Sequence, residues 1–195
     1  MATTLLRLSL ADAGLELTRE EFAEAEFAEP YRYERSQGKL VVMSPAGHEH
    51  HKTTASVHES LVIYKVSRPD IVELVFQESW TAIDEDSDRK PDIAVYLTNA
   101  EPQPDIPERV PELAFEIVSA GWENRRRDYK EKRAEYEQIG VLEYLIVDRF
   151  DHFVTVLRLV EGKYVEHVLM PSDSYSTPML PGLEIPLRDI IGDSH

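Results

Sequence analysis

Residues 113–149 read LAFEIVSAGWENRRRDYKEKRAEYEQIGVLEYLIVDR and contain the step that decides the fold. The segment opens with an apolar run typical of a strand, and a charged helical pattern follows from about Asn124 to Ile139. Gly140 ends that helix, and a second strand follows at 143–149. A strand-helix-strand step of this length suits a right-handed crossover, so we expect the two strands to lie parallel in one sheet.

The remaining segments predict more strands and two further helices. Helical patterns occupy 17–27, where Thr18 and Glu21 have the form of a capping box, and about 48–66. The expected strands are the hairpins 31–45 and 153–170 and the runs 71–83 and 91–97, the last two separated by the charged turn DEDSDRK. This order predicts an α/β or α+β fold, a mixed β-sheet flanked by helices.

The bulk composition is that of a globular protein. The chain has 195 residues, of which 42% are hydrophobic and 30% charged. It contains no cysteine, which excludes disulfides, thiolate metal sites and cysteine catalysis. Its N-terminal stretch lacks the apolar core of a signal peptide, and no apolar run approaches membrane-spanning length. We therefore expect a cytoplasmic protein without a membrane partner.

The formal net charge of −16 limits the ways in which this chain could bind nucleic acid. General electrostatic attraction to phosphates draws on Lys and Arg, so a protein that relies on it is disfavoured. A nucleic-acid enzyme whose local site is basic, or holds a metal ion, remains compatible with this charge.

Two carboxylates occupy strand positions at which an unpaired charge would be costly to bury. Alternation puts Glu116 on the less bulky face of its strand, and Asp92 takes the equivalent face of 91–97. If these strands pair, the carboxylates could converge, and they would then repel each other unless a cation or proton lay between them. Mg²⁺ suits such a pair, because it typically takes one or two protein carboxylates. The alternative is that Asp92 merely begins a strand and Glu116 pairs with an arginine.

The helix within 113–149 adds a cationic element. Asp128, Lys132 and Tyr136 follow one another at four-residue spacing and form one stripe. The densest positive charge of the chain lies at 125–133. A lysine from this helix could stabilise the charge that develops on a phosphate under attack. The alternative is a solvated helix in which Asp128 and Lys132 form an ordinary surface pair.

Several fragments, in their order and spacing, resemble a known family. They are KPD (90–92), FEIVS (115–119), RRDYKEKRAEY (126–136) and GVLEYLIVD (140–148), preceded by LTREEF (17–22), YERSQGKLVVMSP (33–45) and the dipeptide EH (49–50). The chain resembles the Uma-type family of restriction endonucleases, a bacterial branch of the PD-(D/E)XK nuclease superfamily, from about residue 17 to 185. The resemblance implies a restriction-endonuclease-like domain over 17–190, with 1–16 as an N-terminal extension.

The resemblance also implies a chemistry and its residues. It implies hydrolysis of DNA phosphodiester bonds with Mg²⁺ or Mn²⁺, with Asp92 and Glu116 as catalytic residues that hold the metal. The superfamily motif has Lys two residues after the second acid, where this chain has Val118. Lys132 matches the relocated family lysine best and is the third catalytic candidate, with Lys130 as the second choice.

For each of the other candidate residues we weigh a role in the site against a surface or packing role. His50, within HEHH (48–51), matches the family but such runs are more often surface decoration. Glu34 and Glu78 could be extra acidic ligands, and we expect them to be surface strand residues instead. Tyr136 and Tyr144 are expected to be packing groups. Trp122 could stack on a base or pin the loop before the helix.

Three functions follow from these observations. The first is a metal-dependent DNA endonuclease, expected to act as a homodimer because cutting both strands needs two sites. The second is an interaction protein that keeps the nuclease fold with weak or absent hydrolysis, which the acidic charge favours. The third is a nuclease acting on RNA or branched DNA.

Overall fold

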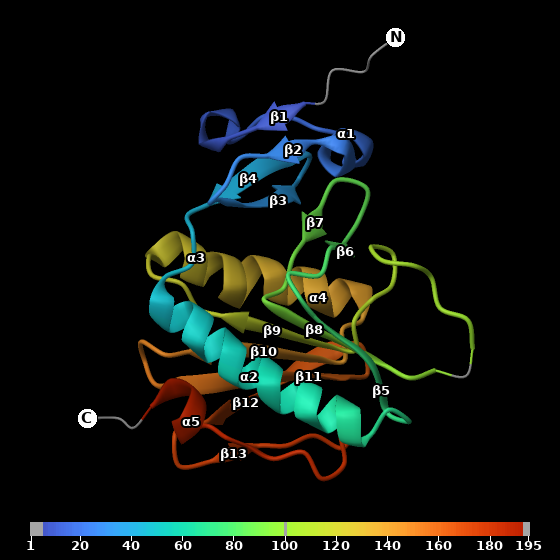
Figure 1. Cartoon of the computed structure of the whole chain (residues 1–195), viewed down its shortest axis with the longest axis vertical. Helices are drawn as coiled ribbons and strands as arrows, with labels where there is room; N and C mark the ends of the chain where they lie inside the picture. The colour runs from blue at the N-terminus through green and yellow to red at the C-terminus, as the bar shows by residue number, and fades with distance from the viewer. Residues whose placement is uncertain (1–5, 100, 193–195) are drawn as a thin grey trace.

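The structure is a computed structural model that describes residues 6–99 and 101–192 (Figure 1). Its helices are α1 (Arg19–Glu24), α2 (His48–Ser67), α3 (Trp122–Arg126), α4 (Arg133–Ile139) and α5 (Arg188–Ile191), with the 3-10 helix η1 (Leu10–Asp12) and the π-helix η2 (Arg127–Lys132). Its strands are β1 (Arg7–Leu8), β2 (Glu26–Phe27), β3 (Arg32–Ser36), β4 (Lys39–Met43), β5 (Val72–Gln77), β6 (Thr81–Ala82), β7 (Asp88–Arg89), β8 (Ile93–Leu97), β9 (Leu113–Ile117), β10 (Glu143–Asp148), β11 (Phe153–Val160), β12 (Lys163–Leu169), β13 (Ser174–Tyr175) and β14 (Ile185–Pro186).

A six-stranded sheet in the order β12-β11-β10-β9-β8-β5 forms the centre of the molecule. Its pairs are antiparallel except for β9 and β10, which run parallel and pair Phe115 with Leu145. The segment α3-η2-α4 connects these two parallel strands. The parallel pairing predicted for 113–149 is therefore confirmed, and the sheet is mixed, as expected.

Helices cover both faces of this sheet (Figure 1). On one face, Val57 and Leu61 of α2 pack in the same buried cluster as Phe115 and Ile117. On the other face, Tyr136 of α4 packs with the side chains that alternate with Phe115 and Ile117 along the strand and so point to the opposite side of the sheet. Burying a large apolar side chain contributes about 1.5–3 kcal/mol, so this alternation drives the assembly of the three layers. The expected fold class, a mixed sheet flanked by helices, is confirmed.

A smaller four-stranded sheet, in the order β4-β3-β7-β6, lies beside the main sheet. The hairpin predicted over 31–45 supplies β3 and β4. The run 71–83 is two strands rather than one, because the backbone turns at Glu78 with a φ of 51°. As a result β5 belongs to the main sheet and β6 to the small one.

The charged segment DEDSDRK is more than the turn that we expected. It contains β7, which pairs with β3 by matching Asp88 with Arg35. Arg35 Nε donates to Asp88 Oδ2 at 2.7 Å, and both side chains are buried. The polar segment can be buried because this ion pair, between residues far apart in the sequence, neutralises its charge.

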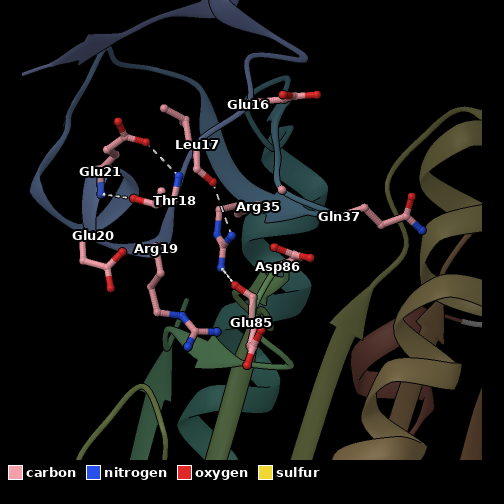
Figure 2. Close-up of a pocket in the computed structure, with 11 residues that line it drawn as sticks. Glu16, Leu17, Thr18, Arg19, Glu20, Glu21, Arg35, Gln37, Glu85 and Asp86 are labelled. Carbon is pink, nitrogen blue, oxygen red and sulfur yellow. Dashed lines mark hydrogen bonds between the residues drawn. The ribbon is translucent and has the colours of Figure 1, made fainter.

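The N-terminal part packs against the small sheet and forms a two-stranded sheet of its own, β1-β2. Thr18 and Glu21 form the predicted capping box of α1, which ends at Glu24 rather than continuing to 27 (Figure 2). Leu8 packs in one cluster with Phe22 and Leu40. The division into an extension of 1–16 and a domain of 17–190 stays a prediction. In the described part of the chain, every helix is too short or too polar to cross a membrane.

Candidate active site

Asp92 and Glu116 lie at the same end of two neighbouring inner strands of the main sheet, β8 and β9. Asp92 directly precedes β8 and Glu116 lies in β9, whose antiparallel register pairs Ile93 with Phe115. One further step of that register puts the two acids opposite each other. The backbone N–H of Ile117 donates to Asp92 Oδ2 at 2.8 Å, and the acids are only 3% and 4% exposed. The two acids therefore lie opposite each other on neighbouring strands, as alternation allowed.

The Asp92 carboxylate is neutralised by side chains from two other elements. Arg32 Nη1 donates to Asp92 Oδ1 at 2.7 Å, and His50 Nε2 lies 3.2 Å from the same oxygen. Burial by itself would raise the pKa of Asp92. The hydrogen bond from His50 and the charge of Arg32 prevail, and they lower the pKa of Asp92 to about 2.

The Glu116 carboxylate is in a different electrostatic environment. Lys132 Nζ donates to Glu116 Oε1 at 2.7 Å, and the Tyr136 hydroxyl donates to the same oxygen at 3.2 Å. Burial nevertheless raises the pKa of Glu116 well above its ordinary value, and the charges of Asp92 and Asp128 raise it further. An excess of negative charge therefore surrounds Glu116, which is the condition under which a carboxylate gains from a nearby cation.

Glu34 belongs to this cluster, so our expectation of a surface residue is wrong. Its side chain is 1% exposed and its Oε1 lies 3.0 Å from Lys132 Nζ. Arg89 Nη1 donates to Glu34 Oε2 at 3.2 Å. The charges of Lys132 and Arg89 overcome the effect of burial and lower the pKa of Glu34 to about 2. Glu34 is buried because the small sheet packs over the helical layer, which no local pattern indicates.

The stripe of Asp128, Lys132 and Tyr136 faces the protein interior. All three side chains are buried, so the alternative of a solvated surface pair is wrong. Burial is the largest cause that raises the pKa of Asp128, to about 6. Lys130, the second choice for the lysine, is exposed to solvent. Among the two candidates, only Lys132 contacts the acids.

The tyrosines combine packing with polar contacts. Tyr136 and Tyr144 lie in one buried cluster, with ring centroids 4.9 Å apart. The Tyr144 hydroxyl donates to the backbone carbonyl of Asp128 at 3.0 Å. The expected packing role is therefore present, and both hydroxyls also orient members of the charge cluster.

The remaining candidates, His50, Glu78 and Trp122, differ in how exposed their side chains are. His50 is 3% exposed, whereas its neighbours His48 and His51 are exposed, so the surface reading fails for His50 alone. Its Nδ1 lies 3.3 Å from the Ser119 hydroxyl. Glu78 is exposed, as expected. Trp122 is 69% exposed and so does not pin the loop in a buried pocket.

Sequence reasoning missed Arg32 and Arg89, which neutralise the acids. Arg32 opens β3 and Arg89 closes β7, and the charge partners of each lie far away in the sequence. Arg89 directly precedes the KPD fragment (90–92), and its closeness to Asp92 was the one sequence feature that could have drawn attention to Arg89. Nothing local marked Arg32.

Three adjoining hollows have volumes of about 240, 250 and 130 Å³, and Met43 lines all three. Asp92 and Glu116 do not line them, but Arg32 and His50, which contact Asp92, do. Their other lining residues include Arg32, His50, Ser119 and Arg149 in the first, Trp122, Asn124 and Arg127 in the second, and Tyr31, Glu78 and Lys90 in the third. We call this continuous surface the Met43 groove. Through Arg32 and His50 it leads directly to Asp92.

A larger hollow of about 590 Å³ lies at the N-terminal part of the small sheet (Figure 2). It is lined mainly by polar and charged side chains, among them Glu16, Glu20 and Asp86. Arg35, at its edge, already donates to Asp88 and to the backbone carbonyl of Glu85. None of the predicted catalytic residues lines this hollow, so its size does not make it the candidate active site.

The donor set fits a divalent cation that is only partly held by protein. Within residues 6–99 and 101–192, no three His, Asp or Glu side chains form a ready-made metal centre. The converging carboxylates of Asp92 and Glu116 match the one or two protein ligands that Mg²⁺ usually takes, with water and substrate oxygens filling the rest. The negative charge surplus around Glu116 favours such an ion.

Comparisons with known proteins identify the family and the fold of this chain. A family model described as Uma2, "Putative restriction endonuclease", matches residues 19–188. The crystal structure of a "putative nuclease belonging to DUF820 from Anabaena variabilis" superposes with a TM-score of 0.71 at 18% identity, covering 90% of this chain and 97% of that one. At this identity the superposition establishes the fold alone. No curated protein matches the chain.

Proposed function

This chain belongs to the Uma2 family, and from that membership we propose that it is a metal-dependent endonuclease that hydrolyses phosphodiester bonds of DNA. Asp92 and Glu116 are the proposed ligands of Mg²⁺ or Mn²⁺. Lys132 is the proposed partner of the phosphate under attack. The family's dependence on metal is general, while the particular ion and the DNA substrate are part of the proposal.

One observation carries this proposal. The Lys132 ammonium lies 2.7 Å from Glu116 Oε1, and Asp92 lies at the same end of the neighbouring strand. The chain therefore places an amine next to an acid pair although Val118 occupies the usual lysine position. This arrangement supports the relocation of the catalytic lysine from the strand to η2.

The protonation states give each side chain its role. Burial lowers the pKa of Lys132, but the charges of Glu116 and Glu34 dominate and raise it, so Nζ keeps its proton. Lys132 then acts as a cation that stabilises negative charge on the phosphate, and not as a base. A divalent ion, when bound, polarises the phosphodiester and activates water at neutral pH. Arg32, lying between Asp92 and the Met43 groove, is suited to orient the scissile phosphate.

The second candidate function is a nuclease-fold protein that binds without efficient hydrolysis. The observation in its favour is that Arg32 and Lys132 already neutralise Asp92 and Glu116, so a metal ion must compete with them. A nuclease acting on RNA or branched DNA is the third candidate. A homodimer, with one site for each strand, and a cytoplasmic location belong to the first proposal.

A cleavage assay tests these candidates. Purified protein is incubated with plasmid, single-stranded DNA and RNA, with Mg²⁺ or Mn²⁺ and then with chelator. We expect metal-dependent cleavage that Glu116→Gln and Asp92→Asn abolish. The matched control is Glu59→Gln, which removes the same charge from an exposed position on α2 outside the groove. Cleavage that survives in Glu116→Gln, or that persists in chelator, would overturn the proposal.

A further inference from the structure

We propose that the Met43 groove binds a single-stranded nucleic acid, with Trp122 as the platform for one base and with Arg127 and Arg149 as phosphate contacts. This inference rests on the proposed function, since the groove matters as the approach to Asp92 and Glu116. It adds the form of the substrate, which membership of the family does not specify, and it replaces the homodimer that cuts both strands of a duplex by a nuclease that acts on one strand.

Access to the acids argues for a single strand. Asp92, Glu116 and Lys132 are each at most 4% exposed, so a phosphate must descend into the protein to reach them. The hollows of the groove have volumes of about 240 and 250 Å³, each below the range of about 300–1,000 Å³ typical of small-molecule pockets. Drawing a nucleotide out of a duplex costs unpairing and unstacking energy, and this cost is smallest for a strand that is already single. A single strand can insert one nucleotide at a time.

Trp122 has the position of a stacking platform. It is 69% exposed at the start of α3, and it lines the second hollow of the groove together with Gly121. Single exposed apolar residues are common and need no explanation by themselves. Here the exposed aromatic face adjoins a groove that leads to an acid pair, and base-aromatic stacking is the usual way to hold unpaired bases.

The two arginines bring positive charge to the groove. Within the described part of the chain, neither Arg127 nor Arg149 forms an ion pair with a carboxylate, although the chain carries a net charge of −16. Arg127 contacts only the Asn124 side chain, at 3.2 Å. Arg149 Nε is buried without a hydrogen-bond partner among those residues. The Arg149 guanidinium also lies over the Phe150 ring, 4.4 Å from its centroid, and the charge of Arg127 helps to lower the pKa of Glu34. Because neither interaction is an ion pair, both guanidinium groups can still bind phosphate oxygens.

The arrangement of the three residues suits a strand better than a compact ligand. Arg149 lines the first hollow, beside His50, while Arg127 and Trp122 line the second. The two hollows share Met43 and Asn124, so a chain that runs through both meets a cation in each hollow and an aromatic ring in the second. This combination of backbone charge and stacking recognises nucleic acid without requiring a particular sequence.

Binding in chelator separates this inference from hydrolysis. Fluorescence anisotropy is measured with labelled single-stranded oligothymidylate, with a blunt duplex of the same length and with polyglutamate as competitor. We expect the single strand to bind at least about tenfold more tightly than the duplex. Trp122→Ala should weaken binding about 5- to 150-fold, as expected for one stacked base, and Trp122→Phe should weaken it much less.

The salt dependence tests the arginines. For single strands the slope of log K against log salt changes by about 0.7 for each phosphate contact, so Arg127→Gln with Arg149→Gln should reduce the slope by about 1.4. Phe76→Ala and Arg68→Gln are the matched controls, because both residues are solvent-exposed and lie outside the groove. Arg68 follows the far end of α2, about 30 Å from the end that borders the groove. Circular dichroism verifies the fold of every variant.

The outcomes distinguish this inference from the proposed function. Binding of the single strand that depends on Trp122, without cleavage under any metal condition, would support the inference and refute the nuclease proposal. Cleavage that depends on Glu116, combined with binding that is unchanged by Trp122→Ala, would do the reverse. Equal affinity for the duplex would overturn the inference, as would displacement of the single strand by polyglutamate, which would identify an acidic peptide as the occupant.

Discussion

Lys132 Nζ lies 2.7 Å from Glu116 Oε1 and 3.0 Å from Glu34 Oε1. Three elements meet at this ammonium group, since Lys132 ends η2, Glu116 lies in β9 and Glu34 lies in β3. The contact therefore joins the helical layer, the main sheet and the small sheet. Because all three side chains are buried, the free energy of unfolding should depend strongly on this cluster.

Replacing Lys132 by methionine should destabilise the fold by about 3–5 kcal/mol, because Glu116 and Glu34 would lose their shared buried cation. Denaturant unfolding at pH 7 measures this change in the free energy of unfolding. The control is Lys130→Met on the same helical segment, where the side chain is exposed and the change should stay within about 0.5 kcal/mol. Equal effects of both substitutions would contradict the buried contact.

Replacing Glu34 by glutamine should cost about 1–3 kcal/mol, because Lys132 and Arg89 would face an uncharged amide in a buried site. The same measurement applies. Glu78→Gln makes the identical chemical change at an exposed residue and should leave the free energy of unfolding nearly unchanged. A neutral result for Glu34→Gln would mean that the ion pairs of Glu34 merely offset its desolvation.

Asp128 should make the protein less stable as pH rises. Its pKa is raised from 3.8 to about 6 in the folded state, so the native protein binds more protons than the unfolded chain between these values. Stability therefore falls as pH rises through this window, by up to about 3 kcal/mol. Asp128→Asn cannot titrate and should gain about that much relative to the parent protein between pH 4 and pH 7.

Thermal unfolding in metal-free buffer across this pH range checks the prediction for Asp128. Because the charge of Asp128 also raises the pKa of Glu116, the difference between the two stability curves reports Asp128 together with its effect on Glu116. Parallel curves for Asp128→Asn and the parent protein would contradict the raised pKa.

Divalent metal should stabilise the folded protein if Asp92 and Glu116 bind it. A ligand present at about 100 times its dissociation constant adds about 2.7 kcal/mol, which appears as a higher melting temperature with Mn²⁺ or Mg²⁺ than with chelator. Glu116→Gln should abolish this shift, and Glu59→Gln, at an exposed position outside the groove, should retain it. A shift of equal size in Glu116→Gln would place the bound metal elsewhere.

The sequence alone determined the central strands β8, β9 and β10, their faces and the parallel step. Alternation in 113–118 separated Phe115, in one buried cluster, from Ala114, in the other, and it put Glu116 on the same side as Ala114. Gly140 ended the predicted helix in a left-handed conformation. These features follow from backbone geometry over a few residues, which is why a single sequence reveals them.

Only the tertiary structure decided how the acids are neutralised. Asp92 contacts Arg32 and His50, which lie 60 and 42 residues away in the sequence, and Glu34 meets Lys132 only because the small sheet packs over η2. Local periodicity cannot predict such partners, since a charge is buried wherever packing of distant elements supplies a counter-charge. The positions of the acids were therefore readable from the chain, whereas their electrostatic environment required the folded molecule.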